Sequence, residues 1–73
     1  MPQEIVEVPI TGKITVVKVT VGCTVKEGDV VCILESMKMQ NPILSPVGGS
    51  VKEVKVAPGQ TVKSGEVIAV IDY

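Results

Sequence analysis

The sequence feature that most constrains the fold of this chain is an internal repeat with a spacing of 37 residues. Residues 9–35 align without a gap on residues 46–72, and 11 of the 27 aligned positions carry identical residues. Two copies of one motif account for most of the 73 residues and leave no room for a second domain. The repeat therefore predicts a single domain, residues 1–73, in which the copies pack about a pseudo-twofold axis and residues 36–45 join them as a hairpin.

Within each copy, the pattern predicts strands separated by glycine turns. Apolar and polar residues alternate over 13–19 and again over 50–56, which is typical of a half-buried strand. An aliphatic, buried strand is expected at the end of each copy. Turns that need a positive φ are expected at four matched glycines: Gly22, Gly28, Gly59 and Gly65.

The composition favours an all-β fold. The chain has 16 valines and 7 isoleucines against 2 leucines and 2 alanines. These β-branched side chains lose rotamer freedom on a helix but pack well on a pleated sheet. Because neither copy is large enough to close a core alone, we expect two facing antiparallel sheets, or a flattened barrel, with valine and isoleucine filling the interior.

The residue types that the chain lacks exclude several classes of function. It has no histidine and no arginine, and Tyr73 is its only aromatic residue. Without histidine there is no Ser–His or Cys–His pair and no imidazole metal site, and without arginine there is no bidentate phosphate clamp. Seven lysines against eight acidic residues give no basic patch for nucleic acid. We therefore predict no catalytic residues, no metal site and no self-contained enzyme.

The sequence also indicates a cytoplasmic protein. The first residues carry no basic stretch, and the longest apolar runs, 30–34 and 67–71, suit buried strands and predict no membrane insertion. The two cysteines are too few for a disulfide scaffold and match no zinc-binding spacing. Both are predicted to be free thiols in a reducing cytosol, with Cys32 in the core and Cys23 in a polar turn.

The segment between the two copies contains Met37 and Met39 on either side of Lys38. Its Met-Lys pair lacks the Asn-Gly signal of a tight hairpin, so any turn there has to be set by the flanking strands. The residues alone leave two interpretations open. In the first, the methionines fill gaps in the core and Lys38 is one more solvated lysine. In the second, Lys38 is an amine displayed on a rigid turn. Methionines on the surface beside a lysine favour this interpretation, because exposed thioethers carry a hydrophobic cost without a structural return.

The run Glu35-Ser36-Met37-Lys38-Met39 resembles the biotinylation signature of biotin carboxyl carrier domains, which is most often Glu-Ala-Met-Lys-Met. The likeness covers nearly the whole chain, from about residue 8 to residue 71. Ser36 stands where alanine is more common, which is a mild variation. The stretch over 17–25 is too short for the protruding "thumb" of some bacterial acetyl-CoA carboxylase carriers, so the chain looks like the thumbless type.

The resemblance implies a flattened antiparallel β-barrel, or sandwich, of two four-stranded sheets with quasi-twofold symmetry. It also implies that Lys38 is the lysine to which a biotin protein ligase attaches biotin. Met37 and Met39 would be the flanking residues that partner enzymes read, and Glu35 and Ser36 would complete the recognition motif. A lysine amine is normally protonated at pH 7, and no residue near this one in the sequence is a base, so the ligase has to remove the proton.

The function implied by the resemblance is that of a carrier subunit or domain, not an enzyme. The chain would carry carboxybiotin from a biotin carboxylase to a carboxyltransferase, within a biotin-dependent carboxylase of the acyl-CoA or 2-oxoacid type or within a decarboxylase. Tethering the cofactor replaces diffusion with a high effective concentration. One alternative is a lipoyl carrier of a 2-oxoacid dehydrogenase or glycine-cleavage type complex, although lipoyl domains usually have aspartate before the lysine and alanine after it. A second is a small β-barrel interaction domain that carries nothing.

Overall fold

Eight β-strands make up this computed structural model, which describes residues 2–73. The strands are β1 (Gln3–Glu7), β2 (Gly12–Val17), β3 (Thr24–Val25), β4 (Val30–Ser36), β5 (Met39–Leu44), β6 (Gly49–Val54), β7 (Thr61–Val62) and β8 (Val67–Asp72). Among the described residues there is no helix that could cross a membrane.

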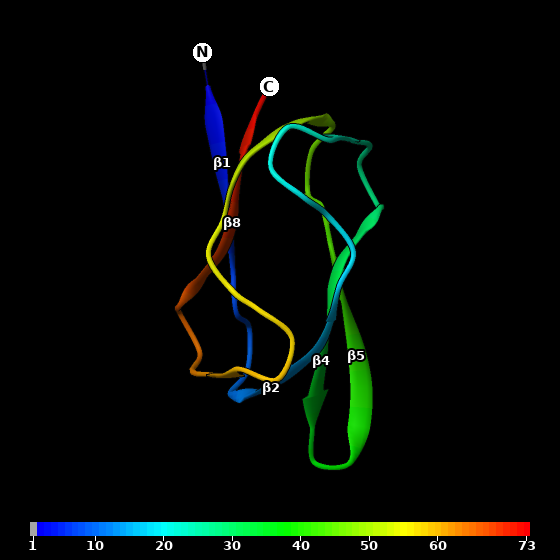
Figure 1. Ribbon diagram of the computed structural model, residues 1–73, viewed down its shortest axis with the longest axis vertical. Coiled ribbons are helices and arrows are strands. Elements are labelled where there is room, and N and C mark those ends of the chain that lie inside the picture. The colour runs from blue at the N-terminus through cyan, green and yellow to red at the C-terminus, as the bar shows by residue number, and fades with distance from the viewer. Residues whose placement is uncertain (1) are drawn as a thin grey trace.

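The strands form two four-stranded antiparallel sheets, which confirms the predicted fold class. The strand order is β1-β8-β6-β3 in one sheet and β5-β4-β2-β7 in the other. We call the first the termini sheet, because it contains both terminal strands, and the second the hairpin sheet, because it contains the β4–β5 hairpin. Figure 1 shows the two sheets facing each other along an elongated body of 36 × 18 × 17 Å.

The repeat in the sequence is a repeat of strands. β2, β3 and β4 recur 37 residues later as β6, β7 and β8. The match also extends beyond the aligned residues, because the β1 positions 3–7 recur as positions 40–44 within β5. The segment 36–45 therefore contains the end of β4, a turn and most of a strand that is the counterpart of β1, so each copy contributes four strands.

Each sheet takes strands from both copies. The short strand β7 of the second copy pairs with β2 in the hairpin sheet, and its counterpart β3 pairs with β6 in the termini sheet. This exchange locks the copies together around one core. The core side chains are almost all aliphatic: Val6, Val8, Ile14, Val19, Val25, Val31, Cys32, Leu34, Ile43, Val51, Val56, Val62, Ile68, Ala69 and Ile71.

Two kinds of glycine shape the connections and the strand starts. The four predicted turn glycines all have a positive φ, between 88° and 93°, as expected. Gly12 and Gly49 are needed for another reason, since they begin β2 and β6 where a neighbouring strand passes closely. A Cβ on Gly12 would lie 2.5 Å from the carbonyl oxygen of Glu35, and a Cβ on Gly49 would overlap the carbonyl oxygen of Asp72.

Both cysteines are free thiols, as predicted, and they differ in environment. Cys32 is fully buried between the sheets, whereas Cys23 is half-buried at the turn before β3. Burial raises the pKa of the Cys32 thiol from 9.0 to about 11, because the thiolate would have to be desolvated.

The folded chain is therefore expected to lose stability as the pH rises from 9 to 11. In this window the unfolded chain releases the Cys32 proton while the folded chain keeps it, so each further rise in pH favours unfolding. The contribution of the Cys32 thiol to the free energy of unfolding is fully present below pH 9. As the pH rises to 11, the free energy of unfolding should fall by about 2 kcal/mol. Urea unfolding at several pH values between 9 and 11 should show this fall in the free energy of unfolding with pH as a slope in the wild type and in Cys23→Ser. The slope should be absent in Cys32→Ala. An equal slope in Cys32→Ala would assign it to other groups.

Candidate functional site

The candidate site is the hairpin formed by β4 and β5. Its last strand pair joins Ser36 to Met39, so the connection between the strands is only Met37 and Lys38. Figure 1 shows this hairpin projecting beyond the rest of the molecule, at the end opposite the N- and C-termini. The structure thus brings all five predicted site residues together at one tip.

The two residues of the turn adopt an unfavourable backbone conformation. Met37 has φ 54° and Lys38 has φ 64°. Positive φ at both central positions is the pattern of a type I′ turn, which matches the twist of the flanking strands and normally uses asparagine and glycine. A side chain with a Cβ is strained in this region, at a cost of about 1 kcal/mol or more per residue. The turn is therefore imposed on Met37 and Lys38 by the strands on either side, as the sequence predicted.

The hairpin is held by contacts below the tip. The Ser36 hydroxyl donates a hydrogen bond of 3.0 Å to the carbonyl oxygen of Thr11, in the connection between β1 and β2. The amide of Asn41 lies within 3.5 Å of the Leu34 carbonyl and within 3.4 Å of the Met39 carbonyl. Ser36, the variation from the usual alanine, therefore ties the lysine hairpin to the body of the domain.

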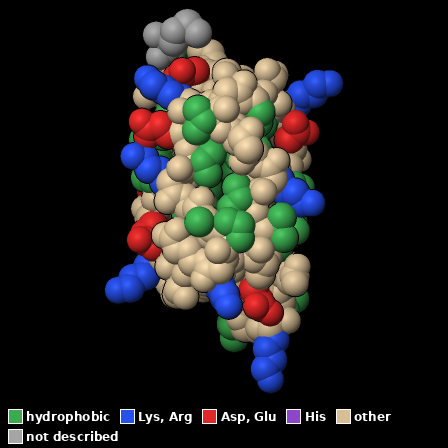
Figure 2. Space-filling view, viewed as in Figure 1, with side chains coloured by type: hydrophobic (Ala, Val, Ile, Leu, Met, Phe, Trp, Pro, Cys, Tyr) green, Lys and Arg blue, Asp and Glu red, His purple; other side chains and the backbone are tan. Residues whose placement is uncertain are grey.

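The tip itself is exposed. Met37 is 92% exposed and Met39 is 67% exposed, which rules out the interpretation that they fill gaps in the core. Lys38 is also exposed, and within residues 2–73 no salt bridge involves it. Figure 2 shows hydrophobic side chains at the projecting end of the molecule, beside charged ones. The tip therefore presents one exposed amine between two exposed apolar side chains.

Relieving the strain of this turn should stabilise the fold. The double substitution Met37→Asn/Lys38→Gly supplies the residues that a type I′ turn prefers, and we expect the free energy of unfolding to rise by about 1–2 kcal/mol. Urea or thermal unfolding measures this rise. The matched control is Met37→Ala/Lys38→Ala, which removes the same long side chains but keeps both Cβ atoms. If the control is stabilised equally, exposed side chains and not backbone strain account for the effect.

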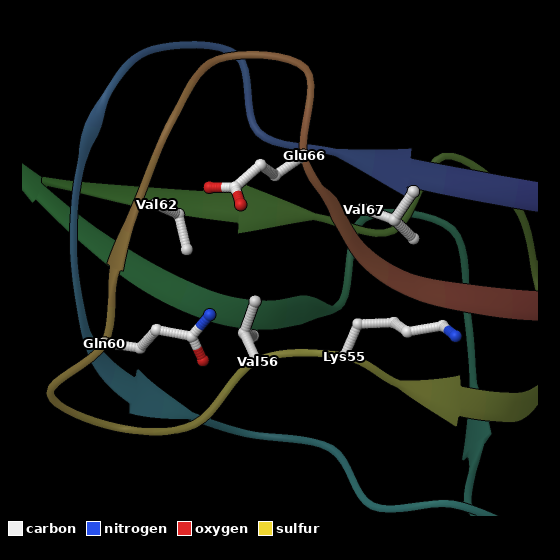
Figure 3. Close-up of a pocket in the computed structure, with 6 residues that line it drawn as sticks. All are labelled: Lys55, Val56, Gln60, Val62, Glu66 and Val67. Atoms are coloured by element: carbon white, nitrogen blue, oxygen red, sulfur yellow. The ribbon is translucent and has the colours of Figure 1, made fainter.

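Neither a candidate metal site nor the described cavity adjoins the tip within residues 2–73. Among residues 2–73 there is no group of three or more His, Cys, Asp or Glu side chains that could hold a metal ion. A cavity of about 360 Å³ lies elsewhere, and no residue of the 35–39 motif lines it. Figure 3 shows its lining, in which the Lys55 amine points away from the other side chains: Lys55, Val56, Gln60, Val62, Glu66 and Val67. The displayed amine is therefore the one candidate for chemistry at this end of the described structure.

A β scaffold that displays a lysine on an exposed turn leaves its amine accessible to another protein. The family described as "Biotin-requiring enzyme", defined by its biotin/lipoyl attachment domain, matches residues 4–71. The chain belongs to this family and is a biotinyl/lipoyl carrier domain. The connection over 18–23 between β2 and β3 has no room for an inserted thumb.

Individual relatives agree with this membership. The chain is 52% identical over 40 residues to the gamma subunit of methylmalonyl-CoA decarboxylase from Veillonella parvula, a match that covers 55% of this chain and 31% of the relative. Among solved structures, it superimposes on a single-chain, multi-domain long-chain acyl-CoA carboxylase with a TM-score of 0.88 and 28% identity, over 93% of this chain and 7% of that one. The urea carboxylase of Kluyveromyces lactis gives a TM-score of 0.90 and 29% identity, over 99% of this chain and 6% of that one. The chain thus spans less than a third of the length of each of these relatives.

Proposed function

We propose that the chain is a biotin carboxyl carrier and that Lys38 is the residue to which biotin is attached. The observation that carries the proposal is the position of Lys38 at the tip of the hairpin, between two exposed methionines, in a member of the attachment family. Met-Lys-Met favours biotin over lipoate, since lipoyl domains usually have other neighbours of the lysine. The names of the relatives, two carboxylases and a decarboxylase subunit, support the same choice.

The geometry of the tip fits the attachment reaction. The Lys38 nitrogen attacks the carbonyl carbon of biotinyl-adenylate, the amide C–N bond forms, the bond to AMP breaks, and a base of the ligase takes the proton of the amine. The chain has to supply only a nucleophile that the ligase can surround, because biotin is held by a bond and needs no pocket. A projecting turn with an exposed lysine meets that need.

The contribution of the chain to the cycle is positional. Attached to Lys38, biotin would supply the carrier chemistry, which is the uptake and release of a carboxyl group. The rigid strands hold the attachment point, and the tether keeps the local concentration of the group high at each enzyme. We place the chain in the cytoplasm, between a biotin carboxylase or another carboxyl donor and a carboxyltransferase. The decarboxylase relative makes methylmalonyl-CoA the first carboxyl donor to test.

Two parallel incubations test the choice of cofactor. The purified chain is incubated with a biotin protein ligase, biotin and ATP, and separately with a lipoate ligase, lipoate and ATP, and the intact mass is measured. We expect one biotinyl group per chain in the first incubation and little change in the second. A chain that accepts lipoate and refuses biotin would overturn the proposal in favour of a lipoyl carrier. A chain that refuses both would exclude either carrier function.

A further inference from the structure

The outer face of the hairpin sheet carries a strip of aliphatic side chains that the core does not use. Strand pairing places Val16 beside Ile33 and Ile33 beside Pro42, and Val30 beside Leu44. Val16 is 39% exposed and Leu44 is 50% exposed, whereas their neighbours Ile14 and Ile43 point into the core. We call Val16, Val30, Ile33, Pro42 and Leu44 the aliphatic strip.

The internal repeat provides a control for this strip, because the termini sheet has the same positions 37 residues away. There, Val70 pairs with both Ile5 and Glu53, and Val67 pairs with Glu7. Val30, Ile33 and Pro42 thus have aliphatic counterparts. Val16 and Leu44, in contrast, correspond to Glu53 and Glu7.

The fold therefore accepts glutamate at both positions. Glu53 even forms a salt bridge of 2.9 Å to Lys55 on the surface of the termini sheet. At the matched positions the outer face of the termini sheet is thus apolar in the middle and acidic at its flanks, whereas all five positions of the aliphatic strip are apolar. Because folding does not require Val16 and Leu44 to be apolar, their exposure needs another explanation.

The strip lies next to the candidate site on the same two strands. One polar row, Lys13, Glu35 and Gln40, separates it from the turn. Pro42 is three residues beyond Met39 along β5, which places it about 10 Å from the end of the hairpin. A protein that surrounds the tip and rests against the hairpin sheet would therefore cover the aliphatic strip.

We propose that the aliphatic strip is the docking surface for the carboxyltransferase that exchanges a carboxyl group with biotin on Lys38, an inference that rests on the proposed function. The partner surface is expected to be apolar and uncharged where it meets Val16 and Leu44. Docking on the sheet brings the hairpin to the mouth of the partner's active site, and the polar row between strip and tip fixes the orientation.

The size of the strip fits this occupant better than others. Five side chains are far fewer than the roughly 20–30 residues per partner in a stable interface, which argues against a permanent dimer of this chain. A carrier has to leave each enzyme in every cycle, so a small apolar contact suits it. A ligase acts on the Lys38 amine at the tip, whereas Leu44 lies at the opposite end of β5 from the turn.

The double substitution Val16→Glu/Leu44→Glu tests the proposal, because it installs the residues that the other copy already carries. The biotinylated variant is assayed as a substrate of the carboxyltransferase that copurifies with the wild-type chain, with methylmalonyl-CoA as carboxyl donor. We expect the KM for the carrier to rise at least about tenfold at an unchanged kcat, because a glutamate would be buried against an apolar surface. The matched control, Glu7→Leu/Glu53→Val, changes the outer face of the termini sheet and should leave KM unchanged.

The rate of biotinylation and the sedimentation behaviour complete the test. We expect biotin ligase to modify Val16→Glu/Leu44→Glu as fast as the wild-type chain. We also expect the wild-type chain to sediment as a monomer. An unchanged KM in the fully biotinylated variant would overturn the docking proposal while leaving the carrier function intact. A slower ligase reaction would assign the strip to the ligase, and a wild-type dimer that the variant dissociates would assign it to a second copy. If the wild-type chain takes up no biotin from the ligase, the proposed function itself fails, which is a different result from an unchanged KM.

Discussion

Lys38→Arg is expected to abolish biotinylation of the chain and to leave its thermal unfolding unchanged. Arginine keeps the positive charge, but its guanidinium stays protonated and cannot act as the nucleophile. Lys38 is exposed and has no salt bridge within residues 2–73, so the free energy of unfolding should change by less than about 0.5 kcal/mol. Intact mass after incubation with biotin ligase reports the modification, and circular dichroism during heating reports the stability.

The matched control is Lys55→Arg, a lysine-to-arginine change in the counterpart copy. Lys55 lies 2.9 Å from Glu53, and arginine can keep that contact, so neither biotinylation nor unfolding should change. Biotin on the Lys38→Arg chain would mean that another of the seven lysines carries the group. Loss of folding in Lys38→Arg would mean that the hairpin lysine has a structural role.

Gly49→Ala is expected to cost at least about 3 kcal/mol, a large part of the stability of so small a domain. The added Cβ would overlap the carbonyl oxygen of Asp72 on β8, next to the strand pair Ser50–Asp72. Because the clash is with backbone and not with a flexible side chain, relief requires β6 and β8 to separate. Urea unfolding should show a much lower midpoint, or no folded state at all.

The neighbouring residue supplies the control. The nearest atom to a Cβ on Gly48 is the carbonyl oxygen of Val25, at 3.6 Å, and Gly48 has no positive φ. Gly48→Ala should therefore change the free energy of unfolding by less than about 1 kcal/mol. Gly12→Ala, at the counterpart of Gly49, should be destabilised as Gly49→Ala is. Equal stability of the Gly48 and Gly49 variants would contradict the packing described for the two sheets.

The architecture could be predicted from the sequence, because the repeat and the β-branched residues act at the level of single strands. The partners of the shortest strands could not. β3 and β7 have two residues each, too few for any pattern, and their exchange between sheets is decided by how the copies pack. The correspondence of β1 with β5 also could not be predicted, because residues 3–7 and 40–44 lie outside the two aligned segments. Its inward pair, Val6 and Ile43, stays aliphatic and Gln3 recurs as Gln40, but Glu7 has become Leu44.

The site could be predicted only in part, and for a different reason. The assignment of biotin to Lys38 is a prediction that rests on the resemblance of its neighbours, since Met-Lys is a poor match to the turn that it forms. The aliphatic strip depends on the strand register, because a bulge between Ile14 and Val16 reverses the alternation there. Simple alternation would place both side chains in the core, whereas the structure places Val16 on the outer face.

The central claim, that this chain carries biotin on Lys38, is tested most directly on the protein isolated from the organism that makes it. Mass spectrometry of the peptide that contains Lys38 identifies the attached group and its position in one measurement. The account predicts a single biotinyl group, on Lys38 and on no other lysine. A lipoyl group on Lys38, or a population of chains without any modification there, would contradict it.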